Sequence, residues 1–401
     1  MSTPAPAAQP SSFAKAIGLA LAAAAVVCVV LLAFAWPSIT SKPHDIPVGI
    51  VGSAEQVSQV EDQLAEQSDG AVDLEVHDDR DAAVAAIEQR EIYGALVLGE
   101  SSGTSMTAPE MLIATAANSA VAQMLQGMAT GMQAQLTTQV NTGVEQQVQQ
   151  LIDALRAVQS GQAPTAPAGE APAAEAAPAT QLPDTFTMPD AQVTVTDVVP
   201  LSEDDPRGAG LSAAALPLVM GGMIGAMIIS TAIHGSRRRL VALIVYTVVA
   251  GLALTAILEG WFGALQNNYW ANALAITLSI GAISATIVGL RSVLGYAGLG
   301  IGAVLMFFFA NPISGSALPP EFLIGSWGAI GQWFPPGAGQ TLIRTLSYFP
   351  DASTLFPWLV LTGWTLFGLI LIWIGSLKKP ARVESEGVAD QKAPAALGEH
   401  A

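Results

Sequence analysis

Long apolar runs alternate with polar stretches along this chain, and these runs are its clearest structural signal. A helix needs about 20 apolar residues to cross the roughly 30 Å hydrocarbon core of a bilayer. Six runs approach or exceed this length: residues 14–36, 211–233, 240–258, 270–290, 293–310 and 355–377. Only Arg291 and Ser292 separate the fourth run from the fifth, so we expect these two to form a tight helical hairpin. The pattern predicts a polytopic α-helical membrane protein with six transmembrane helices.

The block between the first two runs, residues 37–210, has shorter hydrophobic segments that are typical of strands and of amphipathic helices. Residues 46–52, 72–78 and 93–99 have the apolar or alternating pattern of strands. Residues 54–67 and 79–90 between them have the pattern of helices. This order predicts a small α/β unit over residues 46–99, inserted in the membrane protein as part of an extracytoplasmic domain. A later alternating segment, residues 188–201, is a candidate further strand of the same unit.

Apolar residues recur every three or four positions over residues 115–159, between faces rich in Gln, Thr, Asn and Ala. This spacing predicts one long helix, or two helices broken near Gly127 and Gly131 or near Gly143. Its apolar stripe packs against its own domain in one interpretation and forms a coiled coil with a second copy in the other. Residues 160–183 are rich in Pro and Ala, which is typical of a disordered linker.

Residues 211–377 form the predicted five-helix membrane domain, with an outer loop over residues 311–353. Residues 322–334 of this loop are apolar but too short to span a bilayer, and a double proline stands on either side. We expect a re-entrant or interfacial segment, followed by a short helix on the outer surface whose Arg344 faces phosphates or the acidic domain. The candidate residues of an outer gate are Asn311, Pro312, Gly315, Trp333, Pro335, Pro336, Gly337 and Arg344.

Charge is distributed unevenly and gives the orientation. Residues 37–210 contain 25 acidic and 5 basic residues, a net charge of −20, and the rest of the chain carries +3, which sums to the total of −17. With the N-terminus inside, the inner helix ends carry most of the basic residues: Lys15, Arg237, Arg238, Arg239, Arg291, Lys378, Lys379 and Arg382. The positive-inside rule then predicts that both termini are cytoplasmic, with residues 1–13 as a disordered cytoplasmic N-terminus and residues 378–401 as a cytoplasmic tail. The Ala-rich, acidic, lysine-poor composition indicates a bacterium, so we expect a bacterial cytoplasmic (inner) membrane protein.

The first run has an alternative interpretation as a cleaved signal peptide, which would leave five spans. The apolar stretch is longer than the usual core of a signal peptide, and Lys15 is the one charge before it. These features favour an uncleaved first transmembrane helix.

Candidate catalytic chemistry is sparse. The single cysteine, Cys28, and four scattered histidines give no metal-ligand spacing, and the chain has no Walker A motif or nucleophile motif. Glu259 is a possible intramembrane polar residue, although a solvated position at a helix end between Trp261 and Trp270 is the simpler interpretation. We expect no enzyme, no catalytic, cofactor-binding or metal-binding residue, and no nucleic-acid partner.

Five short motifs carry a resemblance to a known family. They are DIPVGIVG (residues 45–52), DPRGAG (205–210), NPISG (311–315), LPPEFL (318–323) and GQWFPPGAG (331–339). With the order of the parts, they resemble the ABC-2 type permease superfamily, in particular the YhgE/Pip-like membrane proteins of actinobacterial type. The resemblance implies a homodimeric transmembrane unit of an exporter for a hydrophobic or envelope-associated substrate, powered by an ATPase on a separate chain.

The arginines of the predicted inner side are the candidate contacts for such a partner: Arg237, Arg238, Arg239 and Arg291. The same charges also serve membrane topology, which is the plainer interpretation. Residues 1–12 are polar and proline-rich, and lack the amphipathic helix that usually precedes the first span in ATPase-coupled members. The alternative is therefore a non-transporting envelope protein, a secretion-machine scaffold or a surface receptor, that acts through its acidic domain.

Overall fold

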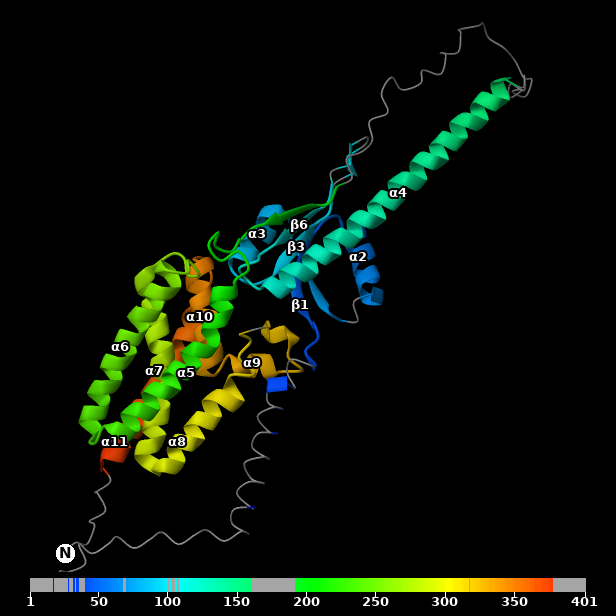
Figure 1. The fold of residues 1–401 in the computed structure, drawn as a ribbon. Coiled ribbons are helices and arrows are strands. Elements are labelled where there is room, and N and C mark those ends of the chain that lie inside the picture. Colours follow the sequence, from blue (N-terminus) through cyan, green and yellow to red (C-terminus); the bar gives the residue numbers. More distant parts are fainter. Residues whose placement is uncertain are drawn as a thin grey trace, which may run out of the picture.

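The computed structural model describes residues 40–67, 70–99, 101–102, 105–106, 108–159, 192–316 and 318–377, and the single positions Ile17, Cys28, Leu32, Phe34 and Ala35. The predicted N-terminal segment 1–13, linker 160–183 and tail 378–401 lie outside the described residues, as does the predicted first span 14–36 except for those positions. A small sheet domain lies at one end of a helical bundle, and one long helix projects from the sheet domain (Figure 1).

The sheet domain has five strands in the order β2-β1-β3-β6-β7. Strand β1 (Ile46–Val51) pairs in parallel with β2 (Val72–Val76) and β3 (Gly94–Val97). The helices α2 (Ala54–Gln67) and α3 (Arg80–Glu88) connect these strands. The predicted α/β order of strands and helices is therefore present.

The sheet continues beyond the part that the sequence pattern indicates. Strand β6 (Glu110–Ile113) pairs antiparallel with β3, and β7 (Thr194–Asp197) pairs in parallel with β6. The segment predicted over residues 188–201 does return to the sheet, with four residues in the strand. The sequence interpretation missed β6, which is too short to show alternation, and the two-residue strands β4 (Ser101–Ser102) and β5 (Ser105–Met106).

Helix α4 (Ser119–Gln159) is one continuous helix of 41 residues, so the alternative of two broken helices is wrong. Asn118 begins it, because its Oδ1 accepts hydrogen bonds from the amides of Ala120 and Val121. The first turns pack on the sheet, where Val121 and Leu125 are buried. At 1.5 Å per residue the helix is about 60 Å long, so most of it extends beyond the sheet (Figure 1).

Among the described residues, four helices are long and apolar enough to cross a membrane: α5 (Ala209–Ala232), α6 (Ser236–Gly260), α7 (Tyr269–Leu294) and α11 (Leu355–Leu377). They correspond to four of the six predicted spans. The predicted span 293–310 is instead α8 (Tyr296–Ala303), with 8 residues, continued by η1 (Val304–Ala310), a π-helix with 7. It is shorter than a straight span requires. The hairpin is present, but it turns at Gly295, and Arg291 and Ser292 lie in the last turn of α7.

Helix α7 is the centre of the bundle, with 78% of its apolar window buried. Small residues let the neighbouring helices approach it closely. A Cβ added to Gly368 of α11 would lie 2.3 Å from the carbonyl carbon of Ala285 in α7, so only glycine fits there. The outer faces of α5, α6 and α11 expose large apolar side chains, as lipid-facing helices do, among them Ile228, Val249 and Trp373.

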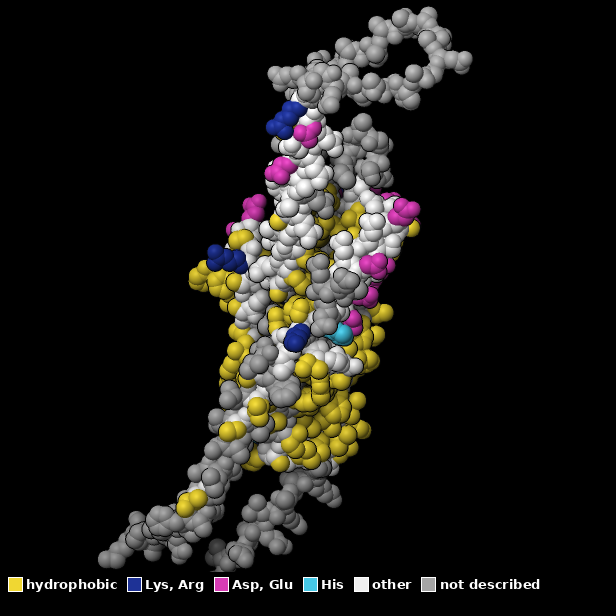
Figure 2. Space-filling model, turned by 90° about the vertical axis from the view of Figure 1, so that its right-hand side faces the viewer, with side chains coloured by type: hydrophobic (Ala, Val, Ile, Leu, Met, Phe, Trp, Pro, Cys, Tyr) yellow, Lys and Arg dark blue, Asp and Glu magenta, His cyan; other side chains and the backbone are white. Residues whose placement is uncertain are grey.

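The two ends of the molecule differ in chemistry. Hydrophobic side chains cover the bundle and acidic side chains lie over the sheet domain and α4 (Figure 2). Helix α5 begins and α6 ends beside the sheet domain, whereas α5 ends, α6 begins and α7 ends at the opposite end of the bundle (Figure 1). The arginines of these helix ends therefore lie far from the acidic domain.

Candidate functional site at the junction of the sheet domain and the bundle

The segment predicted as an outer loop folds into η2 (Pro320–Phe322), α9 (Trp327–Gly331) and α10 (Pro335–Tyr348). The prediction of a helix on the outer surface is wrong, because α10 is buried: Leu342 and Ile343 are 0% and 1% exposed. Helix α10 packs against α7 and α11 at the end of the bundle next to the sheet domain (Figure 1). Its small and apolar residues fit this packed position better than a surface.

Helix α10 begins with the double proline. Pro335 and Pro336 occupy its first turn, where the fixed φ of proline suits a helix and the missing N–H costs no hydrogen bond. Gly337 follows, and a Cβ there would lie 2.3 Å from the carbonyl oxygen of Gly331 in α9. The GAG sequence therefore provides close packing between α9 and α10.

The other predicted gate residues lie in the segment that leads from η1 to α10. The carbonyl oxygen of Asn311 accepts hydrogen bonds from the amide and the hydroxyl of Ser314, at 3.2 and 2.7 Å, in the turn that includes Pro312. Gly315 has a φ of 71° and packs against Pro320. Trp333 is 64% exposed, and its carbonyl accepts a hydrogen bond from the indole of Trp364 at 2.8 Å. These residues have structural roles in a compact segment.

Arg344 has partners that the sequence did not predict. Its Nη1 donates to the carbonyl oxygens of Ala116 and Ala117, both at 3.0 Å, in the segment that leads into α4. Residues 116 and 117 belong to the acidic domain, so Arg344 faces that domain, which is one of the two expected alternatives. It does so through backbone carbonyls and not through carboxylates. Burial lowers the pKa of Arg344 to about 10, so the guanidinium remains protonated at neutral pH. It joins α10 to the backbone of the sheet domain.

Arg90 makes a second connection from the sheet domain. It follows α3 with a φ of 61°, a conformation that few residues other than glycine adopt. Its Nη1 donates to Thr345 Oγ1 at 2.6 Å, and its guanidinium lies 5.2 Å from the ring centre of Phe349. Burial lowers the pKa of Arg90 from its ordinary value.

Tyr93 and Glu321 make the third connection. The phenolic hydroxyl of Tyr93, in the turn before β3, donates to Glu321 Oε2 in η2 at 2.9 Å. Burial raises the pKa of Tyr93, and the neighbouring carboxylate raises it further, so the phenol keeps its proton and donates. Arg90, Tyr93, Glu321, Arg344 and Thr345 are called the junction cluster below.

The junction cluster contains two guanidinium groups and one carboxylate, and its contacts all join the sheet domain to the segment between η1 and α11. Separating a buried charged group from its partner is strongly destabilising. These contacts therefore hold the sheet domain and the segment between η1 and α11 in one relative position. The sequence interpretation found Arg344 but missed the other four residues. One signal was present: Arg90 is among the 5 basic residues of an acidic block, which made it a candidate for a specific contact.

Glu259 lies in the last turn of α6, at the bundle end that faces the sheet domain. It is half-buried and accepts a hydrogen bond from Asn272 Nδ2 at 3.3 Å. Trp261 and Trp270 beside it are 79% and 72% exposed. These neighbours agree with the simpler interpretation of Glu259 as a polar residue at a helix end.

The predicted arginine contacts separate into two pairs at the opposite end of the bundle. Arg237 and Arg238 are exposed in the first turn of α6. Arg239 is half-buried and donates from Nε to the carbonyl of Ile233 at 2.7 Å and from Nη2 to the carbonyl of Ser230 at 3.1 Å. Arg291 lies 4.1 Å from the ring centre of Tyr296. Of these four arginines, Arg237 and Arg238 are the exposed ones.

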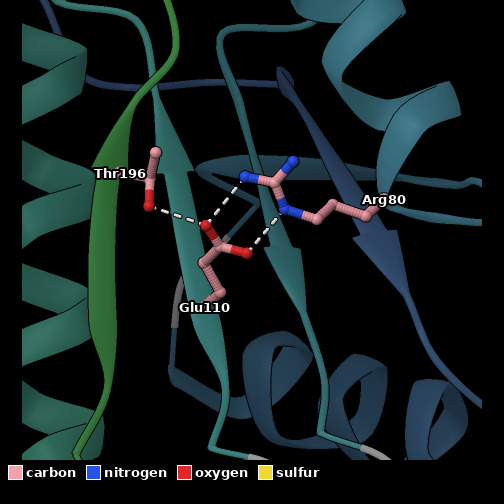
Figure 3. A network of polar contacts seen from close by, with 3 residues as sticks. All are labelled: Arg80, Glu110 and Thr196. Carbon is pink, nitrogen blue, oxygen red and sulfur yellow. Dashed lines mark hydrogen bonds and ion pairs between the residues drawn. The ribbon is translucent and has the colours of Figure 1, made fainter.

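A separate polar network fixes the far strand of the sheet (Figure 3). Arg80 donates from Nε and Nη2 to the two carboxylate oxygens of Glu110, at 2.7 and 3.0 Å, and Thr196 donates to Glu110 Oε1 at 2.6 Å. The hydrogen bonds from Arg80 hold the pKa of Glu110 below its ordinary value. Glu110 therefore connects α3 with β6 and with β7, which returns to the sheet only after a long excursion of the chain.

Comparison with protein-family models, with curated proteins and with solved structures gives no match for this chain. Within the described ranges, no group of three or more His, Cys, Asp or Glu side chains is arranged to hold a metal ion.

Proposed function

We propose that this protein is a membrane-embedded, permease-like subunit of an ABC-2 type exporter that moves a hydrophobic or envelope-associated substrate. Its ATPase would be a separate chain. The observation that carries the proposal is the junction cluster, because it couples an extramembrane domain to a buried segment of a helical bundle. The family resemblance of the motifs gives the class of transporter.

The coupling has a direct mechanical consequence. Helix α10 packs on α7 and α11, so a rearrangement of these two helices displaces α10. Arg344 and Thr345 on α10 are hydrogen bonded to the sheet domain, which then moves with it. Hydrogen bonds to charged groups contribute about 1.5–3 kcal/mol each, so the domain follows α10 more readily than it detaches. In this proposal, the sheet domain opens and closes the outer mouth of the pathway.

The orientation belongs to the same proposal. The arginine-bearing helix ends lie opposite the acidic sheet domain, which supports a cytoplasmic position for the arginines and an extracytoplasmic one for residues 37–210. We place the protein in a bacterial cytoplasmic membrane as a homodimer, with both termini inside. Arg237 and Arg238 are then the exposed contacts for the ATPase.

The test is purification of the tagged full chain from its native membrane in mild detergent, with identification of the chains that accompany it. The proposal predicts a stoichiometric ATPase that is lost in the Arg237→Ala/Arg238→Ala variant. Arg156→Ala, which removes an exposed arginine on α4, is the matched control and should retain the ATPase. Recovery of the protein alone, or with parts of a secretion machine, would contradict the powered-permease function.

Helix α4 favours the second candidate, a non-transporting scaffold or receptor. Its apolar stripe continues past the sheet, where Val148 is 49% exposed and Ile152 is 36% exposed. A projecting helix with such a stripe suits contact with another protein, including a coiled coil with a second copy. Deletion of the outer half of α4 distinguishes the candidates: export should survive in a permease, and partner recovery should be lost in a scaffold.

A further inference from the structure

Helix α8 and its continuation η1 have an open apolar stripe on their outward face. Ala297 is exposed, Ile301 is 51% exposed and Val304 is 54% exposed. These positions are three or four residues apart and lead to the half-buried Phe308, so they follow one side of the helix. The stripe runs from the hairpin at the arginine-bearing end of the bundle to the end beside the sheet domain (Figure 1). In a membrane, lipid or another helix covers such a stripe.

The end of the stripe beside the sheet domain contacts the first apolar run of the chain. The ring centre of Phe34 lies 5.5 Å from that of Phe307 and 6.5 Å from that of Phe308. Aromatic pairs at such distances are stabilising beyond the area that they bury. Further along the chain, the amide of Lys42 donates to the carbonyl oxygen of Phe322 in η2 at 3.2 Å. The chain is therefore attached to the segment that contains η1 and η2 before it enters β1.

The described positions of the first run have helical backbone and indicate which side of the helix faces the bundle. These positions are Ile17, Cys28, Leu32, Phe34 and Ala35. Ile17 and Leu32 are 59% and 58% exposed, and Cys28 is also exposed. With 3.6 residues per turn, these three lie about 100–160° around the helix from Phe34. The side that bears Phe34 is therefore the side that packs on the bundle.

The apolar residues on that side match the stripe in spacing and in size. Steps of four, three and four residues lead back from Phe34 along the first run, and the same steps lead back from Phe308 along the stripe. At about 1.5 Å per residue, two helices that run in the same direction stay in register over these steps. The pairs of this register are Val30 with Val304, Val27 with Ile301, and Ala23 with Ala297.

We propose that residues 14–36 form a transmembrane helix that packs along α8 and η1 of the same chain and parallel to them. Phe34 fixes one end of this helix beside η1, so a helix that crosses the bilayer from there runs alongside α8. The stripe benefits from such a neighbour, because α8 and η1 contain only 8 and 7 residues and η1 has the irregular backbone of a π-helix. The first helix then attaches the start of β1 to the bundle, in addition to the junction cluster.

The test is disulfide cross-linking of the full chain in membranes. Two variants are made in a Cys28→Ser background: Val27→Cys/Ile301→Cys and Val30→Cys/Val304→Cys. The matched control keeps the natural Cys28 and adds Ile301→Cys, because Cys28 lies about 100° around the helix from Val27. After mild oxidation, free thiols are labelled with a maleimide polymer that adds mass. An unlabelled monomer of full length then reports a disulfide within one chain.

We expect the unlabelled monomer to form at least tenfold faster in both designed variants than in the control. Equal rates in the designed and control variants would contradict the proposed face of the first helix. Two labelled thiols in both designed variants would show that lipid covers the stripe. Disulfide-linked dimers would show that the first helix of a second copy covers it, and a shortened chain with one thiol would show that the first run is cleaved. Each of these results would overturn the proposal, and either pair tests it if the other variant does not fold.

Discussion

The hydroxyl of Tyr93 and the carboxylate of Glu321 form a hydrogen bond of 2.9 Å across 228 residues of sequence. Tyr93 belongs to the sheet domain, and Glu321 belongs to the segment between η1 and α11. This bond is thus one of the points at which folding of the sheet domain depends on folding of the bundle.

Removal of the Tyr93 hydroxyl should destabilise the junction. Tyr93→Phe leaves the Glu321 carboxylate without this donor, and we expect a loss of about 1–3 kcal/mol in the free energy of unfolding. In a double-mutant cycle with Glu321→Gln, the two losses should be less than additive, because both variants remove one interaction. Tyr269→Phe is the matched control: Tyr269 bonds to the carbonyl of Leu252 within the bundle, and its effect should add to that of Glu321→Gln.

Replacement of Arg344 should cost more. Arg344→Met keeps an unbranched apolar stem but removes the guanidinium, which leaves the carbonyls of Ala116 and Ala117 without their donor. We expect a loss of about 3 kcal/mol or more in the free energy of unfolding. Arg156→Met on α4 should change the unfolding free energy by less than about 0.5 kcal/mol, because that arginine is exposed. Similar small effects of both substitutions on unfolding in detergent would contradict the role given to Arg344.

Two glycines of α11 provide a matched test of the bundle. Gly368→Ala places a Cβ 2.3 Å from the Ala285 carbonyl carbon and should separate α11 from α7, with a large loss of monodisperse protein. Gly363→Ala, on the same helix, meets no atom within 4 Å and should be neutral or slightly stabilising. Equal yields and equal melting temperatures for the two variants would contradict the packing described.

The pH dependence of the sheet domain should include a contribution from Glu110. Since the folded state holds the pKa of this carboxyl below its ordinary value of 4.5, its stabilising contribution is present above that pH and is lost as the pH falls through the folded value. Glu110→Gln should cost about 1 kcal/mol at pH 7. Unfolding measured from pH 7 to pH 3 should show the difference between Glu110→Gln and the wild type shrinking below about pH 4.5. A constant difference would show that the charge of Glu110 has no part in the network.

The sequence predicted the elements whose pattern is local and strong. The four long apolar helices and the strands and helices of residues 46–99 follow from runs and periods of hydrophobic residues. Strand β6 was missed because four residues show no period, and the single turn at Gly295 was misplaced because Arg291 resembles the end of a helix.

The junction cluster could not be predicted in the same way. Arg344 was expected to face phosphates or the acidic domain, and it does meet that domain. Its actual partners are backbone carbonyls, which leave no trace in the sequence. Arg90 and Thr345 are 255 residues apart, and their contact depends on how two folded parts dock. Single-sequence patterns contain no information on such docking.

The most direct test of the coupling between the sheet domain and the bundle is hydrogen exchange of the full chain in nanodiscs, comparing the wild type with Arg344→Met. In the wild type, the amide of Ala116 is bonded to the Val199 carbonyl and the amide of Ala117 to the Ala114 carbonyl. If Arg344 couples the two parts, the variant should exchange faster both at these amides and along α10. Faster exchange confined to α10, with Ala116 and Ala117 unchanged, would contradict the account.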